Sequence, residues 1–126
     1  MGKVVRLHDG LRALYPDALV FGGIGTTDVV REFDRIRALL GQSPLTCDQS
    51  ALTIAINRDG LVIWAEAPVL SLRMGELAAI GIDDGAMDVT ALVAGRTAAF
   101  CVPLAVPAES GHIADRIFAA LAARTA

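Results

Sequence analysis

A hairpin signal at residues 57–60 constrains the fold of this chain more than any other feature. The turn sequence Asn57-Arg58-Asp59-Gly60 stands between two runs, 52–56 and 61–65, in which apolar residues alternate with polar or small ones. Asp-Gly favours the backbone of a tight hairpin turn, and alternation with a period of two matches a strand with one buried face. We therefore expect two antiparallel strands joined at this turn.

The same alternation continues toward the C-terminus. A strand, a short turn around Gly75-Glu76 and a second strand are expected over residues 69–82. Residues 89–93 and 98–102 alternate on either side of Gly95-Arg96, which predicts a further hairpin. Strands that are linked by hairpins pair antiparallel.

Two segments have the spacing of amphipathic helices that pack on a sheet. Apolar residues recur every three or four positions over 28–40, where Thr26 or Thr27 can cap the helix and Gly41 can end it. A last helix is expected after Ser110.

The first 21 residues contain two shorter patterns. Residues 4–14 have helical spacing up to Tyr15-Pro16, and residues 18–21 predict a brief strand that stops at Gly22-Gly23. Together the patterns predict an α+β fold, with a bent antiparallel sheet packed by the helix at 28–40 and by a C-terminal helix. We expect the 126 residues to form one domain. In it, residues 1–50 are expected to be the helical and strand N-terminal part, and residues 51–126 the hairpin sheet with its closing helix.

Residues 52–126 resemble the small bacterial pleckstrin-homology-like domains. The resemblance rests on the hairpin over 52–64, the strand pattern over 72–82, the hairpin at Gly95 and the closing helix. It implies a curved sheet with the last helix plugging one end. The lipid-binding form of these domains needs several basic residues near the first hairpin. Here Arg58 is the only basic residue in that position, so the resemblance does not imply lipid binding.

The sequence from Asn57 to Ile63 also looks like the first hairpin of roadblock/longin-type regulatory domains. That resemblance implies a first helix at 28–40, a second helix over 72–80 and a homodimer formed through sheet or helix surfaces. Neither resemblance supplies catalytic residues.

A glycine-rich segment is the candidate for a small-ligand site. Gly22, Gly23, Gly25, Thr26 and Thr27 join the predicted strand to the helix, where backbone N–H groups can hold an anion. A lysine in the position of a phosphate-binding loop is absent, and so is a GxGxxG pattern. A plain tight turn is the competing interpretation.

Other reactive side chains are scattered. Cys47 and Cys101 form no CxxC pair, and His8 and His112 lie at opposite ends of the chain. The acidic residues around Gly85 lack the spacing of a calcium loop. We therefore predict no catalytic residues, no metal site and no cofactor.

Composition bears on the partners. Eleven Lys and Arg against fourteen Asp and Glu give a net charge of −3, which argues against nucleic acid as a partner. Charges at Arg6 and Asp9 interrupt any secretory signal, and no apolar run is long enough for a membrane helix, so we expect a cytoplasmic protein without membrane insertion. Hydrophobic residues make up 54% of the chain, which favours a homo-oligomer or another protein as the cover for surplus apolar surface.

Val62 and Trp64, the only tryptophan, are the candidate interface residues because they alternate with the apolar set Leu61, Ile63 and Ala65. A core position for Trp64 is the alternative. The expected function is a non-catalytic cytoplasmic interaction or regulatory module that works as a homodimer. The alternative is a small enzyme or an anion-binding or small-ligand-binding protein with its site near Gly22–Thr27.

Overall fold

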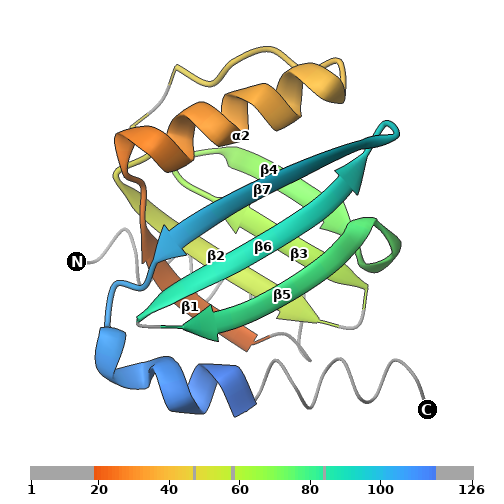
Figure 1. The fold of residues 1–126 in the computed structure, drawn as a ribbon. Helices are drawn as coiled ribbons and strands as arrows, with labels where there is room; N and C mark the ends of the chain where they lie inside the picture. The colour runs from red at the N-terminus through yellow and green to blue at the C-terminus, as the bar shows by residue number, and fades with distance from the viewer. Residues whose placement is uncertain (1–18, 47, 58, 84, 116–126) are drawn as a thin grey trace.

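The structure is a computed structural model that describes residues 19–46, 48–57, 59–83 and 85–115 (Figure 1). Its elements are β1 (Leu19–Ile24), α2 (Thr27–Leu39), β2 (Ala51–Asn57), β3 (Gly60–Trp64), β4 (Pro68–Arg73), the 3-10 turn η1 (Met74–Glu76), β5 (Leu77–Asp83), β6 (Ala86–Val93), β7 (Arg96–Pro103) and the 3-10 turn η2 (Pro107–Glu109). Residues 110–115 are helical.

The strands form two antiparallel sheets, β1-β2-β3-β4 and β5-β6-β7, which face each other with their strands crossing (Figure 1). The chain passes from the first sheet to the second through η1, where the turn around Gly75-Glu76 was predicted. At the opposite corner Gly23 forms a bridge with Leu104, and the Ala105 N–H donates to the Gly22 carbonyl at 3.0 Å. The predicted α+β class, the antiparallel pairing and both predicted hairpins are confirmed.

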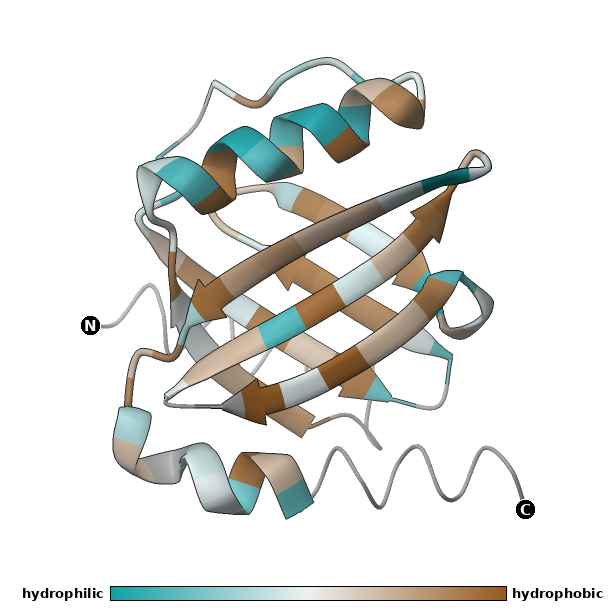
Figure 2. Cartoon of the chain, viewed as in Figure 1, coloured by the Kyte–Doolittle hydropathy of each residue, from teal (hydrophilic) through white to brown (hydrophobic). Residues whose placement is uncertain are grey.

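The core lies between the two sheets. Alternate residues of each strand are buried between the sheets. Figure 2 shows the bands of hydrophobic residues along the strands. Its fully buried members include Ile54, Ile56, Leu61, Ile63 and Leu72 from the first sheet, and Met87, Val89, Ala91, Val93 and Val102 from the second. Apart from Met87, which precedes the predicted strand over 89–93, these are the inward positions that the alternation predicted.

Helix α2 covers the side where the edge strands β4 and β7 lie (Figure 1). Its start is capped by Thr26, whose Oγ1 accepts a hydrogen bond from the Val29 N–H at 3.3 Å. Phe33 is fully buried and meets Phe100 of β7 edge-to-face, with ring centroids 5.3 Å apart. Arg37 donates to the Val69 carbonyl at 2.8 Å, so the helix is tied to both sheets.

The prediction that the first strand stops at Gly22-Gly23 is wrong, because β1 continues to Ile24. Glycine is needed at position 23 for close approach, since a Cβ there would lie 2.7 Å from Val102 Cγ1 and 3.0 Å from Ile54 Cδ1. The two glycines therefore belong to the sheet. The helix predicted over residues 4–14 lies outside the described residues.

Candidate functional site

The predicted interface pair lies on the outer face of the four-stranded sheet. Leu61 and Ile63 of β3 are buried in the core, so the alternating residues Val62 and Trp64 point to the opposite face. Both are half-buried. Trp64 is thus outside the core between the sheets, and its side chain remains partly accessible.

The centre of this outer face is well covered. Antiparallel pairing places Ala55 of β2 opposite Val62, and Thr53 opposite Trp64. Ala55 and Thr53 are each only 2% exposed. The accessible apolar side chains of this face therefore lie around its centre, and they include the half-buried Val62 and Trp64 of β3 and also Ile24 of β1, which is 45% exposed.

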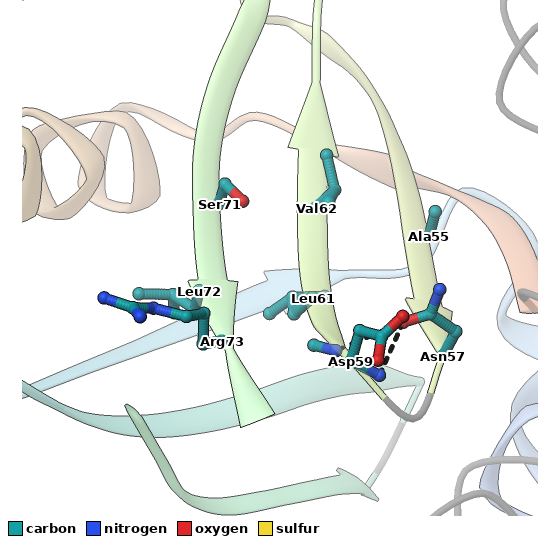
Figure 3. A pocket seen from close by; sticks show the side chains of 9 residues that line it. Ala55, Asn57, Asp59, Leu61, Val62, Ser71, Leu72 and Arg73 are labelled. Atoms are coloured by element: carbon teal, nitrogen blue, oxygen red, sulfur yellow. Dashed lines mark hydrogen bonds between the residues drawn. The ribbon is translucent and has the colours of Figure 1, made fainter. Parts of the chain in front are cut away.

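A hollow of about 210 Å³ opens beside Val62. Figure 3 shows Ala55, Val62 and Ser71 side by side on neighbouring strands, in agreement with their register. The hollow is lined by Ala55, Asn57, Asp59, Gly60, Leu61, Val62, Ser71, Leu72 and Arg73. Its floor is apolar, and its rim carries polar groups.

The hairpin turn fixes one end of the hollow. The Asn57 side-chain oxygen accepts hydrogen bonds from the N–H groups of Asp59 at 2.8 Å and Gly60 at 3.1 Å. The Asp59 carbonyl in turn accepts from the Met74 N–H at 2.9 Å, which ties the turn to η1. Residue 58, the single basic residue considered for lipid binding, lies outside the described residues.

The polar side chains at the rim of the hollow are better placed to contact another molecule than to catalyse a reaction. Arg73 has a side chain that is 90% exposed, with its Nε 3.8 Å from the Glu76 carboxylate. Exposed ion pairs of this kind contribute little to stability, so the guanidinium can take another partner at small cost. Ser71 is exposed, and the described lining places no imidazole beside it to activate its hydroxyl.

A second hollow, of about 400 Å³, lies between α2 and the outer face of β6 and β7. Asp28 and Glu32 of the helix and Asp88 and Cys101 of the sheet are among its lining residues. Desolvation, a hydrogen bond with Asp88 and the charge of Asp88 all raise the pKa of the Cys101 thiol. The thiol is therefore held in its protonated form, which is the less nucleophilic one.

The other predicted reactive residues are not brought together. His112 is exposed at the helical residues 110–115, whereas His8 and Cys47 lie outside the described residues. Within the described part of the chain, no group of three or more His, Cys, Asp or Glu side chains could hold a metal ion. The same part contains no helix that is both long and apolar enough to span a membrane.

The glycine-rich segment forms a close connection between β1 and α2. Gly22 and Gly23 pair with Thr53 and Leu52 inside the sheet. The Gly25 N–H donates to the Ser50 carbonyl at 3.0 Å, so it is not directed at a ligand. Packing explains the glycines of this segment, and the small-ligand site there stays a prediction.

Comparison with known proteins gives no match to a family model, to a curated protein or to a solved structure. The segment that would form the second helix of a roadblock/longin-type domain, residues 72–80, instead contains the end of β4, η1 and the start of β5.

The sequence analysis found Val62 and Trp64 but missed the hollow that Val62 lines together with residues of β4. Ser71 and Arg73 belong to the hollow because β4 pairs with β3, and Val62 lies opposite Ser71. The pairing of β3 with β4 passes through a bulge at Ile63/Trp64 that no sequence signal marks.

Proposed function

We propose that this chain is a non-catalytic interaction or regulatory module that works as a homodimer and buries the apolar surface around Val62 and Trp64 against a partner protein. The observation that carries the proposal is the half-buried apolar pair on β3 next to a hollow of about 210 Å³. Interfaces gain most of their energy where a few anchoring side chains fill such hollows.

The chemistry of the surface supports this proposal. An apolar floor surrounded by Asn57, Asp59, Ser71 and Arg73 has the general arrangement of an interface, with an apolar centre and a polar rim. The exposed, free thiol of Cys101 is compatible with a reducing compartment such as the cytoplasm.

A photocrosslinking amino acid at position 71 tests the surface directly. Ser71 is exposed and lies opposite Val62, so a probe there reaches whatever covers this face. In the native host we expect one discrete crosslinked product, whose mass identifies a second copy or another protein. Val62→Lys should reduce that product about tenfold or more, because burying an unpaired ammonium in an interface costs well over 1 kcal/mol.

The matched control carries the same probe at Thr97, an exposed position on the outer face of the other sheet. That probe should give no product that depends on Val62. A probe at position 71 that crosslinks nothing, or a product insensitive to Val62→Lys in a folded variant, would contradict the proposal. Far-ultraviolet circular dichroism establishes that the variant is folded.

The ligand-binding alternative predicts a different result. If Gly25 and Thr26 held an anion at the start of α2, inorganic phosphate, nucleotides or sugar phosphates would raise the melting temperature through linkage. We expect no such increase, because the Gly25 N–H already donates to Ser50. A concentration-dependent rise in melting temperature with any of these anions would favour the alternative.

A further inference from the structure

Two small side chains at the centre of the outer face of the four-stranded sheet are almost completely buried. Thr53 and Ala55 of β2 are each 2% exposed, although they point away from the core between the sheets. In register, Ala55 lies between Val20 of β1 and Val62 of β3, which are themselves only half-buried. Neighbours beside an alanine cannot exclude water from above it, so a further layer lies over β2 at this point.

The described elements outside the sheet do not account for this layer. Helix α2 packs on β7 and β4, and the main described neighbours of β2 are β1 and β3. The connection from α2 to β2 runs back along α2 (Figure 1). The helical residues 110–115 place Ile113 in the hydrophobic core, where it is 2% exposed. Within the described residues, therefore, no helix or strand from outside the sheet packs extensively on β2.

The first 18 residues have a sequence that suits such a layer. Val4, Leu7, Leu11 and Leu14 recur with helical spacing and would form one apolar stripe, with charged residues on the opposite side. A sheet face with small residues accepts the larger side chains of a stripe of this kind, because large and small side chains interdigitate across a packed layer. The small residues of β2 and the leucines of this segment are therefore complementary.

The length and the exit point of the segment also fit. Strand β1 begins at Leu19, which lies opposite Ile56 beside the β2–β3 turn, so the preceding residues leave from one end of the outer face. Tyr15-Pro16 ends the helical spacing before the strand begins. As a helix, residues 4–14 would span about 16 Å, against about 14 Å for three inter-strand spacings. A helix of this length is long enough to cross the face from the side of β1.

We propose that residues 4–14 pack as an amphipathic helix on the outer face of β1 and β2, with Thr53 and Ala55 beneath its apolar stripe. This contact lies within one copy of the chain and does not depend on the homodimer of the proposed function. Burial on this face falls from β2 toward β4, where Ser71 is exposed, so the helix leaves the β4 half open. The hollow that Val62 and Ser71 line lies toward that open half, and a partner bound there would meet the edge of the helix.

Thiol labelling at position 55 tests the contact in the full chain. Ala55→Cys, made after Cys47 and Cys101 are replaced by serine, puts a reactive thiol at the covered point. We expect a maleimide to label it about 100-fold more slowly than Ser71→Cys in the same background, because labelling requires local opening of the cover. Leu11→Asp should raise the labelling rate at position 55 about tenfold or more, since a carboxylate in the apolar stripe weakens the contact.

Ala13→Asp is the matched control, because position 13 faces away from the apolar stripe of the same predicted helix. It should leave the labelling rate at position 55 within about twofold of the rate without it, as for an ordinary surface substitution. Circular dichroism establishes that each variant is folded. Leu11→Ala takes the place of Leu11→Asp if the acidic variant unfolds.

The assignment is overturned if Ala55→Cys is labelled as fast as Ser71→Cys in the folded chain, or if neither substitution of Leu11 changes its protection. Protection that Leu121→Asp removes and Leu11→Asp does not would assign the cover to the C-terminal residues instead. Protection that is lost when the protein is diluted would show that a second copy covers the face. That last result would contradict the intramolecular contact and support the homodimer of the proposed function.

Discussion

Replacing Phe33 by alanine is expected to destabilise the domain by about 3–5 kcal/mol, because it empties a fully buried aromatic site. The ring joins α2 to β7 through its edge-to-face contact with Phe100 at 5.3 Å. Loss of that contact adds to the cost of the cavity. Urea unfolding followed by circular dichroism measures the change.

Leu40→Ala is the control for this prediction, since Leu40 lies just after the same helix and is 36% exposed. It should cost less than about 1 kcal/mol, because little apolar surface is lost. If both variants were equally stable, α2 would contribute little to holding the two sheets together, contrary to the arrangement in Figure 1.

Gly25→Ala is expected to destabilise the chain by about 3 kcal/mol or more, or to prevent folding. A Cβ at this position would lie 1.7 Å from the Gln49 carbonyl oxygen, which is backbone and cannot rotate away. Forced overpacking of this kind typically costs 1–3 kcal/mol and occasionally more. Thermal and urea unfolding give the measurement.

Gly75→Ala provides the comparison, because a Cβ there meets nothing within 4 Å. Its stability should stay within about 0.5 kcal/mol of the parent chain, as for ordinary surface substitutions. Should Gly25→Ala prove as stable as Gly75→Ala, the packing explanation of the glycine-rich segment would be wrong. That result would favour the interpretation of this segment as a small-ligand site.

Several parts of the fold follow from local chemistry. The hairpin between β2 and β3 was predicted from the Asp-Gly turn and the alternation around it, and α2 was predicted from its apolar spacing and its threonine cap. Both signals act over a few residues, so they are visible without the tertiary structure.

Only part of the candidate surface could be predicted from the sequence. Alternation along β3 put Val62 and Trp64 on one face, and the structure agrees. The burial of Ala55 and Thr53 on that same face, and the hollow shared with Ser71, depend on which strands become neighbours.

The sequence alone determined the class of the fold, the positions of most strands and the helix that caps them, because turn chemistry and periodicity are local properties of the chain. Tertiary structure decided how the strands divide into two sheets and why Gly23 and Gly25 must lack side chains. These features arise from contacts between residues far apart in the sequence, such as Gly23 with Val102.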